Sequence, residues 1–350
     1  MKISARDNIL RTLNFEYPEW IPAIFSMSID AWYYRRDDVR QIVEAYPDII
    51  NASDFDWEID ESSLPPSYSP GLFTDNWGCV WENIHLGMEG QVIKPPLQEW
   101  SAFDSYRPPD YNEFSERGPA NWQQKIDDNH NRKQAGLITY GDGGRLFDRL
   151  YFLRGFENLM MDFADDHPKL PLLINLLWEH SLGNAQKWLD IGVDIMSFHT
   201  DIGTQQSLMI SPEHFRKYLK PMFKDIFQTI RNRGVHVELS SDGNLSSIVD
   251  DLIECGISSH DPQYRACSLE GIKTHYYGKP ITIKLDLDRQ LFPFATPEEI
   301  DRHVRESVKA LYRPEGGLAV MGHIYGDNVP LENIRALAEA LRKYCIKMEF

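Results

Sequence analysis

The chain has 350 residues, and its 53 aspartates and glutamates exceed its 36 lysines and arginines, giving a formal net charge of −17 at pH 7. This charge opposes binding to nucleic acids or anionic membranes, so we expect small molecules or another protein as partners. No run approaches the ~18 apolar residues of a membrane span, and the polar start MKISARDN lacks a signal-peptide core, so the sequence predicts a cytoplasmic protein.

The first 120 residues contain few regular elements. Ser4 is placed to cap a first helix, and Pro-, Trp-, Asp- and Ser-rich sequence fills residues 46–120, whose aromatic content is too high for disorder. We therefore expect residues 46–120 to be an elaborated region over the mouth of the fold. The predicted elements are a helix over 5–13, a strand over 20–25, a helix over about 37–45, and β-like runs at 79–81 and 91–94.

From residue 136 onward, apolar strands and amphipathic helices alternate with short connections. Strands are predicted over 137–141, 194–198, 235–239, 281–285 and 318–321. Helices are predicted over 149–163, 169–189, 212–233, 245–255, 297–312 (capped by Thr296) and 330–344. This alternation implies right-handed crossovers and a parallel sheet, and no G-x-G-x-x-G follows an early strand. The sequence thus predicts an α/β TIM (β/α)8 barrel, with residues 1–350 forming one domain.

Four predicted strands end in charged or hydroxylated residues. They read IMSFHTD (195–201), VHVELSSDGN (235–244), ITIKLDLDRQ (281–290) and LAVMGHIYGDN (318–328). Parallel barrel strands present their carboxyl ends at one mouth, where active sites form. Alternation along each strand predicts shared faces for Ser197, His199 and Asp201, for Glu238, Ser240 and Asp242, and for Lys284, Asp286 and Asp288, while His323 ends the last strand.

Each of these residues can be read in two ways. Any one of them can cap the following helix or pair with a neighbouring charge. Acidic groups gathered in a cleft, however, raise one another's pKa unless a cation offsets their negative charge. Lys284 or a divalent metal could supply that positive charge. Nitrogen and oxygen donors suited to zinc are His199, Asp201, Glu238, Asp242 and His323, although no H-x-H or H-x-x-x-H spacing occurs.

Arginines, aromatic residues and cysteines carry weaker signals. Arg145, Arg149 and Arg154 can clamp a substrate carboxylate or form salt bridges on a helix. Trp77 and the other N-terminal aromatic residues can wall a pocket for a flat substrate or pack beneath the loops. Cys79, Cys255, Cys267 and Cys345 have no C-x-x-C spacing, so we expect small buried residues rather than disulfides or thiolate ligands.

With these residues in view, the chain resembles the uroporphyrinogen decarboxylase superfamily, which includes cobalamin-dependent methyltransferases. The opening RDNILRTLNFEYPEWIPAIF is similar to the family start RE-x-x-LR-x-L-x-x-x-x-x-D-R-x-P, and FTDNWGCVWEN (73–83) is similar to the DEWG-type segment of the methyltransferase-like branch. Further segments resemble the family in order and spacing: RLYFLRGFENLMMD (149–162), DIGTQQSLMISPEHFRKYLKP (201–221), SSDGN (240–244), LDLDRQ (285–290) and GHIYGDNVPLENI (322–334). The resemblance implies the barrel fold.

Departures from the family pattern narrow the choice of substrate and of metal site. The segment SMSIDAWYYRR (26–36) lacks the RQAGR loop with which the decarboxylases hold substrate carboxylates, so porphyrinogen is a poor candidate substrate. The resemblance places Asp75 at the decarboxylases' key aspartate and His323 at their GHG histidine. The thiol-activating methyltransferases bind zinc through His-x-Cys and a further Cys, and here Ser240, Asp242 and His323 occupy those places, which leaves only an oxygen and nitrogen site.

The leading hypothesis is a methyltransferase that moves a methyl group from a methylated small molecule, such as a methoxylated aromatic, to a corrinoid (cobalamin) cofactor on a partner protein. A Lewis acid or a proton donor at the ether oxygen would improve the leaving group. The expected catalytic residues are Asp75, Tyr140, His199, Asp201, Ser240 and Asp286; the expected substrate-binding residues are Arg145, Arg149, Trp77 and Lys284; and the expected zinc ligands are Glu238, Asp242 and His323.

Two alternatives remain open at this stage. A metal-free decarboxylase would use Asp75 and His323 to manage protons while Arg145 or Arg149 holds a carboxylate. A non-catalytic barrel that binds a corrinoid or another ligand would have lost its zinc ligands.

Overall fold

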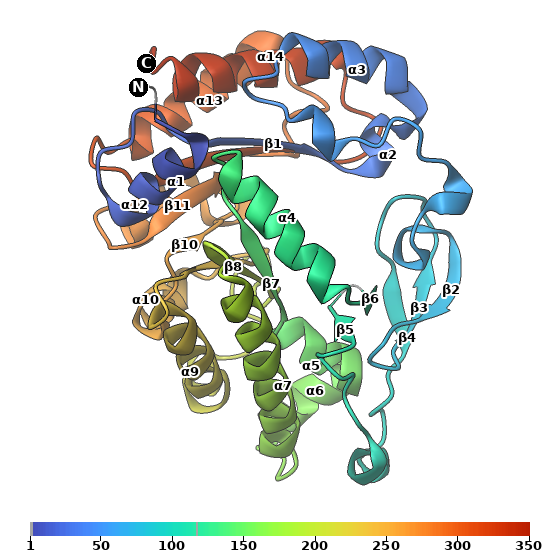
Figure 1. Cartoon of the computed structure of the whole chain (residues 1–350). Helices are drawn as coiled ribbons and strands as arrows, with labels where there is room; N and C mark the ends of the chain where they lie inside the picture. Colours follow the sequence, from blue (N-terminus) through green and yellow to red (C-terminus); the bar gives the residue numbers. More distant parts are fainter. Residues whose placement is uncertain (1–2, 117) are drawn as a thin grey trace. The chain divides into compact units, whose positions relative to one another are not determined.

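The computed structural model describes residues 3–116 and 118–350, and the chain divides into two compact units (Figure 1). Unit 1 contains the described residues up to Asp7, then Phe73–Trp81 and Val92–Asp261. Unit 2 contains Asn8–Leu72, Glu82–Gln91 and Pro262–Phe350. The expectation of one domain over the whole chain stays a prediction.

A parallel sheet forms the centre of unit 1. Its strand order is β7-β8-β9-β10, and every neighbouring pair is parallel. Because a helix follows each of the first three strands, the chain returns to the same end of the sheet each time, as the predicted crossovers require. The strand bounds are β7 Tyr140–Arg145, β8 Ile195–His199, β9 His236–Ser240 and β10 Ser259–His260.

The longer helices α7 and α9 of unit 1 each bury an apolar face. In Figure 1 α7 and α9 lie side by side, and Leu177 of α7 and Phe227 of α9 are both almost fully buried. The bounds are α4 Trp122–Gln134, α5 Phe147–Arg154, α6 Phe156–Ala164, α7 Leu170–Ile191, α8 Pro212–His214, a π helix Phe215–Leu219, α9 Lys220–Arg231 and α10 Val249–Cys255. Short 3-10 helices occupy Trp100–Ser105 and Ser246–Ile248, and β5 Phe114–Ser115 pairs antiparallel with β6 Gly118–Pro119.

Two predicted helices of unit 1 are interrupted, and one strand is displaced. The helix expected over 149–163 breaks at Gly155, whose φ of 87° is outside the helical range. The helix expected over 212–233 contains a π turn just before Pro221, because proline cannot donate to the carbonyl four residues earlier and its ring excludes that carbonyl. The strand expected over 137–141 is β7, which begins three residues later and extends to Arg145.

In unit 2 three parallel strands pair in the order β1-β12-β11. The strands are β1 Ala23–Met27, β11 Thr282–Asp286 and β12 Leu318–Ile324. Since β12 runs three residues beyond its predicted end, His323 lies within the strand. The helices are α1 Ala5–Asn14 (in unit 2 from Asn8), α2 Ile29–Trp32, α3 Arg36–Ala45, α11 Tyr264–Cys267, α12 Leu269–Tyr276, α13 Pro297–Leu311 and α14 Leu331–Leu341, with a 3-10 helix Tyr33–Arg35 and a π helix Arg342–Ile346.

Local signals explain several elements of unit 2. Thr296 caps α13 as predicted, accepting from the backbone N–H of Glu299, whose carboxylate accepts in return from the Thr296 N–H. Helices α13 and α14 lie side by side in Figure 1. Some N-terminal aromatic residues pack against one another, because the Trp32 ring lies 5.7 Å from Phe55 and 5.4 Å from Trp57.

The described residues of the segment 46–120 form short elements rather than long ones. Besides the 3-10 helix Trp100–Ser105 and strands β5 and β6 given above, it contains the 3-10 helices Ala52–Asp54, Glu61–Ser63 and Pro66–Tyr68 and the strands β2 Gly71–Thr74, β3 Val80–Asn83 and β4 Gln91–Lys94. Its position over the mouth stays a prediction. All four cysteines are buried with free thiols, in agreement with the expectation of small packing residues.

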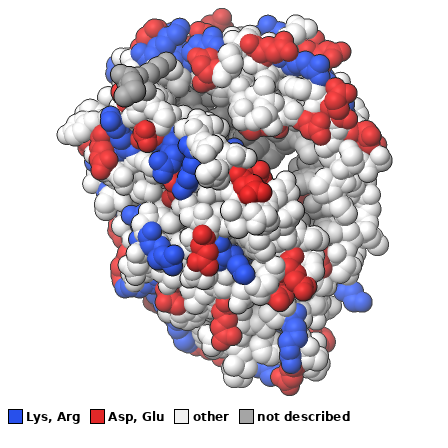
Figure 2. Space-filling view, viewed as in Figure 1, with Lys and Arg blue, Asp and Glu red and all other residues white. Residues whose placement is uncertain are grey.

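The structure gives the hydropathy of the helices and the distribution of charge on one face of the molecule. Within residues 3–116 and 118–350, no helix has the length and apolar character needed to span a membrane. On the face shown in Figure 2, acidic and basic side chains are interspersed.

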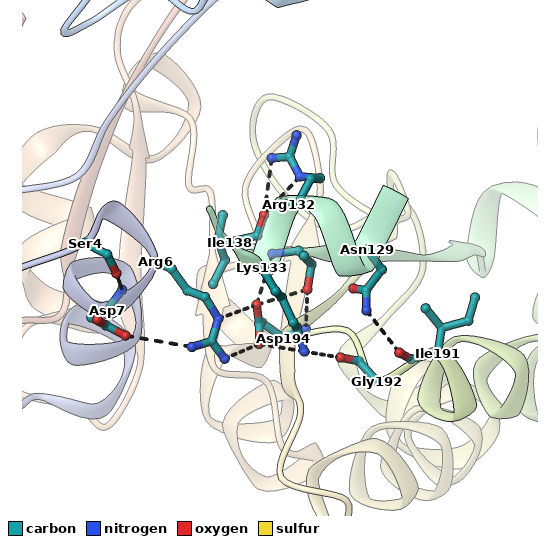
Figure 3. Close-up of polar contacts among 11 residues, drawn as sticks. Ser4, Arg6, Asp7, Asn129, Arg132, Lys133, Ile138, Ile191, Gly192 and Asp194 are labelled. Atoms are coloured by element: carbon teal, nitrogen blue, oxygen red, sulfur yellow. Dashed lines mark hydrogen bonds and ion pairs between the residues drawn. The ribbon is translucent and has the colours of Figure 1, made fainter. Parts of the chain in front are cut away.

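The amino ends of β7 and β8 are held by the buried carboxylate of Asp194 (Figure 3). Arg6 donates to it from Nε at 3.0 Å and from Nη2 at 2.7 Å, and Thr139 donates from its backbone N at 3.1 Å and its Oγ1 at 3.0 Å. The Lys133 ammonium of α4 lies 3.4 Å away. Burial alone would raise the pKa of Asp194, but the hydrogen bonds from Arg6 and Thr139 and the charge of Lys133 outweigh it, so the pKa is lowered.

Replacing Asp194 with alanine should lower the free energy of unfolding by about 3 kcal/mol, because it leaves Arg6, Lys133 and Thr139 without their shared acceptor. Since the folded pKa is depressed, the contribution of Asp194 is present above the unfolded pKa of about 4 and is lost as pH falls through the folded value. Urea unfolding from pH 3 to 7 measures both effects. The control Asp190→Ala removes an exposed carboxylate 4.0 Å from Arg233 and should change stability by less than about 1 kcal/mol. Equal losses of unfolding free energy in the two variants would contradict this role of the Asp194 carboxylate.

Candidate functional site

Polar side chains face one another across β8 and β9 in unit 1. The strand register pairs Ser197 with Glu238 and His199 with Ser240. Ser197 Oγ donates to Glu238 Oε1 at 3.2 Å, so the two faces predicted from alternation are neighbours in the sheet. Glu238 is buried, whereas His199 at the end of β8 is exposed.

The loops that follow β8 and β9 are joined by hydrogen bonds that backbone N–H groups of the second loop donate to the first. Because β8 ends at His199 and β9 at Ser240, Asp201 and Asp242 lie in these loops rather than in the strands. The backbone N of Asp242 donates to Asp201 Oδ1 at 2.8 Å. The N of Asn244 donates to the Thr204 carbonyl at 2.8 Å, which ties the second loop to the first.

Two glycines allow this close approach. Gly243 has a φ of 89°, and a Cβ placed on it would lie 2.4 Å from the carbonyl carbon of Gly203. A Cβ on Gly203 would in turn lie 2.9 Å from the Asp242 carbonyl oxygen and the Asn244 nitrogen. Since the obstructing atoms are backbone, they cannot move aside as a flexible side chain can.

A carboxyl pair lies where β7 and β8 lead into these loops. Asp148, in the first turn of α5, is 5% exposed, and its Oδ1 accepts from the backbone N of Asp201 at 2.6 Å. Burial and the neighbouring Asp201 carboxylate raise the pKa of Asp148 to about 7, against the smaller opposing effects of Arg145 and of the Tyr151 hydroxyl. At neutral pH the Asp148 carboxyl can therefore hold a proton.

Ser240 is engaged with a residue that the sequence reasoning did not select. Its Oγ donates to Asp261 Oδ2 at 2.6 Å, and the backbone N of Ser241 donates to Asp261 Oδ1 at 3.0 Å. The buried Asp261 therefore orients the Ser240 hydroxyl and the start of the loop after β9.

Arg149 forms a buried ionic cluster in unit 1. Its Nη1 donates to Asp75 Oδ2 at 3.0 Å and its Nη2 donates to Glu116, while its guanidinium carbon lies 4.7 Å from the centre of the Trp77 ring. Burial raises the pKa of Glu116. Burial by itself would lower the pKa of Arg149, but the neighbouring carboxylates of Glu116 and Asp75 outweigh this effect, so the pKa of Arg149 is raised. With two carboxylates already bound, Arg149 has the geometry of an internal salt bridge.

Asp75 and Trp77 belong to the turn that this cluster stabilises. Asp75 Oδ1 accepts from the backbone N of Trp77 at 3.0 Å and of Cys79 at 2.8 Å, and its Oδ2 accepts from Trp81 Nε1 at 3.0 Å. The Asp75 carboxylate thus organises the FTDNWGCVW segment through four donors, counting Arg149. Its proposed catalytic role remains a prediction.

Arg145 and Tyr140 occupy opposite ends of β7. Arg145 ends the strand in register with His199, and its Nε lies 3.8 Å from Glu116 Oε1. Tyr140 begins the strand, about 16 Å away at the rise of an extended chain. The displacement of β7 from its predicted range therefore puts Tyr140 at the amino end of the strand, away from the residues described above.

In unit 2, β11 and β12 carry the remaining candidates. His323 Nδ1 lies 3.0 Å from Ser26 Oγ of β1, and the His323 ring stacks on Tyr325 with centroids 3.9 Å apart. Asp286 is buried at the end of β11, where Arg289 Nε lies 3.8 Å from its Oδ2. Lys284 is half-buried and in register with Ala319 of β12.

The expected zinc ligands do not form a metal site as they lie. Among the residues that the structure describes, no three His, Cys, Asp or Glu side chains are grouped so that they could hold a metal ion. Glu238 accepts from Ser197 and is buried, whereas Asp242 is exposed. Because this donor arrangement does not fit zinc, no step proposed below uses it.

The sequence reasoning missed Asp148, Glu116 and Asp261. Asp148 has one local signal, since it is an acidic residue in the first turn of the helix that follows β7. Glu116 and Asp261 have none, because their partners lie 33 and 21 residues away in the chain.

A family model and one solved structure support the fold. A family model described as uroporphyrinogen decarboxylase (URO-D) matches residues 148–344. A solved methyltransferase from Methanosarcina mazei is similar over 98% of this chain and 99% of its own, with a TM-score of 0.64 and 15% identity. A Xanthomonas albilineans dihydropteroate synthase covers 59% of this chain and 68% of its own, with a TM-score of 0.35 and 10% identity. No curated protein matches the sequence. The predicted α/β TIM-barrel class is confirmed.

Replacing Gly243 with alanine should destabilise the protein by more than the about 1–2 kcal/mol expected for a left-handed residue alone, because the new Cβ also meets the Gly203 backbone. The matched control is Gly234→Ala, at a φ of 77° with no atom within 4 Å of the new Cβ. Urea unfolding compares the two variants, and hydrogen exchange at the Asn244 amide reports on the loop contact. Equal destabilisation with unchanged exchange would contradict the close approach.

Proposed function

The chain belongs to the uroporphyrinogen decarboxylase family, and on this premise we propose that it is a methyltransferase. In this proposal it moves a methyl group from a methylated small molecule, such as a methoxylated aromatic, to a corrinoid cofactor on a partner protein. The similarity in fold to a methyltransferase over nearly the whole of both chains supports the reaction class. The lack of an RQAGR loop in residues 26–36 disfavours porphyrinogen as the substrate.

The observation that carries the proposal is the carboxyl pair of Asp148 and Asp201. The pKa of Asp148, which burial and the Asp201 carboxylate raise to about 7, makes this carboxyl a proton donor at physiological pH. An ether oxygen is a poor leaving group until it is protonated, so breaking an oxygen–methyl bond needs such a donor. Asp201 is half-buried and lies in the loop after β8, whereas Asp148 is buried beneath it. We therefore assign proton delivery to Asp201 and proton storage to Asp148.

The corrinoid, when its carrier protein is bound, supplies the nucleophile that accepts the methyl group. The residues of this chain hold the substrate, keep water out and move the proton from the carboxyl pair to the ether oxygen, so that a neutral alcohol or phenol is released. Tyr151 donates a hydrogen bond to Asp148 and Asp242 donates its backbone N–H to Asp201, which fixes the pair in place.

The other candidates stay proposals for substrate handling. The exposed His199 and the Ser240 hydroxyl follow β8 and β9 most directly, and Ser240 is already oriented by Asp261. The full set of these proposed residues is Asp75, Tyr140, His199, Ser240 and Asp286 for catalysis, and Trp77, Arg145, Arg149 and Lys284 for substrate binding.

A direct test mixes the purified chain with a panel of methoxybenzoates and cob(I)alamin. We expect methylcobalamin, detected by absorbance, and the matching hydroxybenzoate in equal amounts, with activity surviving a chelator because no step uses zinc. The control variant Asp128→Asn, exposed on α4, should remain active. No methylcobalamin with any member of the panel would contradict the proposal.

Replacing Asp148 with asparagine should slow methyl transfer by roughly 10²–10⁴-fold, the usual contribution of a general acid. In the wild type the rate should fall as pH rises through about 7, because the pair then loses its proton, and this limb should be absent in the variant. Asparagine cannot ionise, so the variant should also lose the destabilisation that a raised carboxyl pKa causes above pH 7. Rate profiles and urea unfolding between pH 5 and 9 measure both effects, and an unchanged rate limb would exclude the role of Asp148.

A carboxy-lyase is the second candidate, and the description of the matching family model favours it. The same carboxyl pair could protonate the carbanion left by loss of carbon dioxide. Release of carbon dioxide from a cyclic carboxylate, without methyl transfer, would select this reaction.

A further inference from the structure

Ser240 ends β9 on the face of the strand that α9 does not cover. Its register partner in β8 is His199, and the residue before it, Leu239, pairs with Phe198. Successive side chains of a strand point to opposite faces, so Ser240 and Leu239 lie on different faces. The Phe198 ring is 5.0 Å from the Phe227 ring of α9, which places Phe198 and Leu239 on the helix side. Ser240 is therefore half-buried on the opposite face of the sheet.

The hydroxyl proton of Ser240 is held by Asp261, the residue that follows β10. Ser240 Oγ donates to Asp261 Oδ2 at 2.6 Å, a length typical of a hydroxyl bound to a carboxylate. The backbone N of Ser241 donates to Asp261 Oδ1 at 3.0 Å. Each carboxylate oxygen thus accepts from one of two adjacent residues, so the carboxylate cannot rotate without losing a hydrogen bond. The direction of the Ser240 O–H bond is fixed as a result.

This arrangement makes Ser240 Oγ a hydrogen-bond acceptor for a ligand. A hydroxyl has one proton to donate and two lone pairs that accept. The proton is directed to Asp261, and within residues 3–116 and 118–350 no group donates to Ser240 Oγ. Donation to a carboxylate also raises the electron density on Oγ, which strengthens a hydrogen bond that this oxygen accepts. Ser240 therefore suits a ligand group that donates a proton, and it repels one that has only lone pairs.

The carboxylate assigned to proton delivery is close to this hydroxyl, and both belong to unit 1. Asp201 Oδ1 accepts at 2.8 Å from the backbone N of Asp242, two residues after Ser240. The chain spans at most about 6 Å from Ser240 Cα to that nitrogen, so the Asp201 oxygen lies within about 9 Å of Ser240 Cα. A substituted benzene ring with a hydrogen bond at each end can span such a separation.

We propose that Ser240 and Asp261 select a methyl donor that carries a hydroxyl or primary amino group. Ser240 Oγ accepts a hydrogen bond from that group, and Asp261 is a positioning residue that fixes the direction of the Ser240 hydroxyl. A second methoxy group at the same place has no proton to donate, so it is disfavoured. The inference rests on the proposed function and deepens it, because it states which second substituent the methyl donor bears.

Binding of matched aromatic probes to the full chain tests the proposal without turnover. Calorimetry compares the isomeric methoxyphenols and methoxyanilines with the corresponding dimethoxybenzenes and with anisole. We expect at least one hydroxyl or amino probe to bind about tenfold more tightly than anisole, as one net hydrogen bond provides. The dimethoxybenzenes should bind no more tightly than anisole. Equal affinities of all probes, or no binding of any hydroxyl or amino probe, would overturn the proposal.

Two serine variants assign the preference to Ser240. Ser240→Ala removes the acceptor at little cost in volume, so the hydroxyl and amino probes should bind no more tightly than anisole. The matched control is Ser247→Ala, at an exposed serine in the 3-10 helix that follows the same strand, and this variant should keep the full preference. Urea unfolding checks that both variants are folded. A preference that survives in Ser240→Ala would overturn the assignment.

The variant Asp261→Asn provides a readout that loss of structure cannot mimic. The Ser241 N–H keeps the amide oxygen as its acceptor, which turns the amide NH2 toward Ser240. The amide then donates to Ser240 Oγ, and the Ser240 hydroxyl proton becomes available to the ligand. We expect the dimethoxybenzenes to bind more tightly than anisole in this variant, the reverse of the wild-type order. An unchanged order of affinities would overturn the positioning role of Asp261.

These outcomes are separable from those of the methyl-transfer assay. Tighter binding of the hydroxyl or amino probes without any methyl transfer would support selection by Ser240 and contradict the proposed function. Methyl transfer by a chain that binds all the probes with equal affinity would support the function and overturn this inference.

Discussion

The carboxylate of Asp194 is the interaction on which the arrangement of unit 1 depends. It brings together Arg6, Lys133 and Thr139 at the amino ends of β7 and β8. Because the carboxylate is buried, its negative charge stabilises the fold only while these donors surround it. Since β8 has only five residues, a shift at its amino end would move the register that places Ser197 beside Glu238. Rigidity at one end of the sheet thus permits loops and ionisable groups at the other.

At the carboxyl ends of β8 and β9, close packing of two loops positions an ionisable group. The loops after β8 and β9 approach each other through Gly203 and Gly243, and this approach holds Asp201 against the backbone N of Asp242. Asp148 is buried beneath Asp201, and burial raises its pKa. Burying the Asp148 carboxyl makes this part of the protein less stable than an apolar side chain at the same position would. In return, the protein gains a group that exchanges a proton near pH 7.

Local signals in the sequence were sufficient for several elements and for part of the site. Thr296 caps its helix as expected, and Glu299 completes the capping box. Alternation assigned Ser197 and Glu238 each to a face of its own strand, and the structure shows that these two side chains are neighbours. The sequence did not reveal where β7 begins, because its glycine-rich YGDGGR lacks an apolar pattern, and this error moved Tyr140 to the amino end of the strand.

The sequence alone was enough for the parallel α/β class and for the location of polar residues at strand ends, because strand alternation and helix capping act between residues close in the chain. Only the tertiary structure decided what those residues do. Arg149 meets Asp75 across 74 residues, and Asp148 meets Asp201 across 53. Charge, burial and hydrogen bonding depend on such distant partners, so neither the salt bridge of Arg149 nor the raised pKa of Asp148 could be predicted from local pattern.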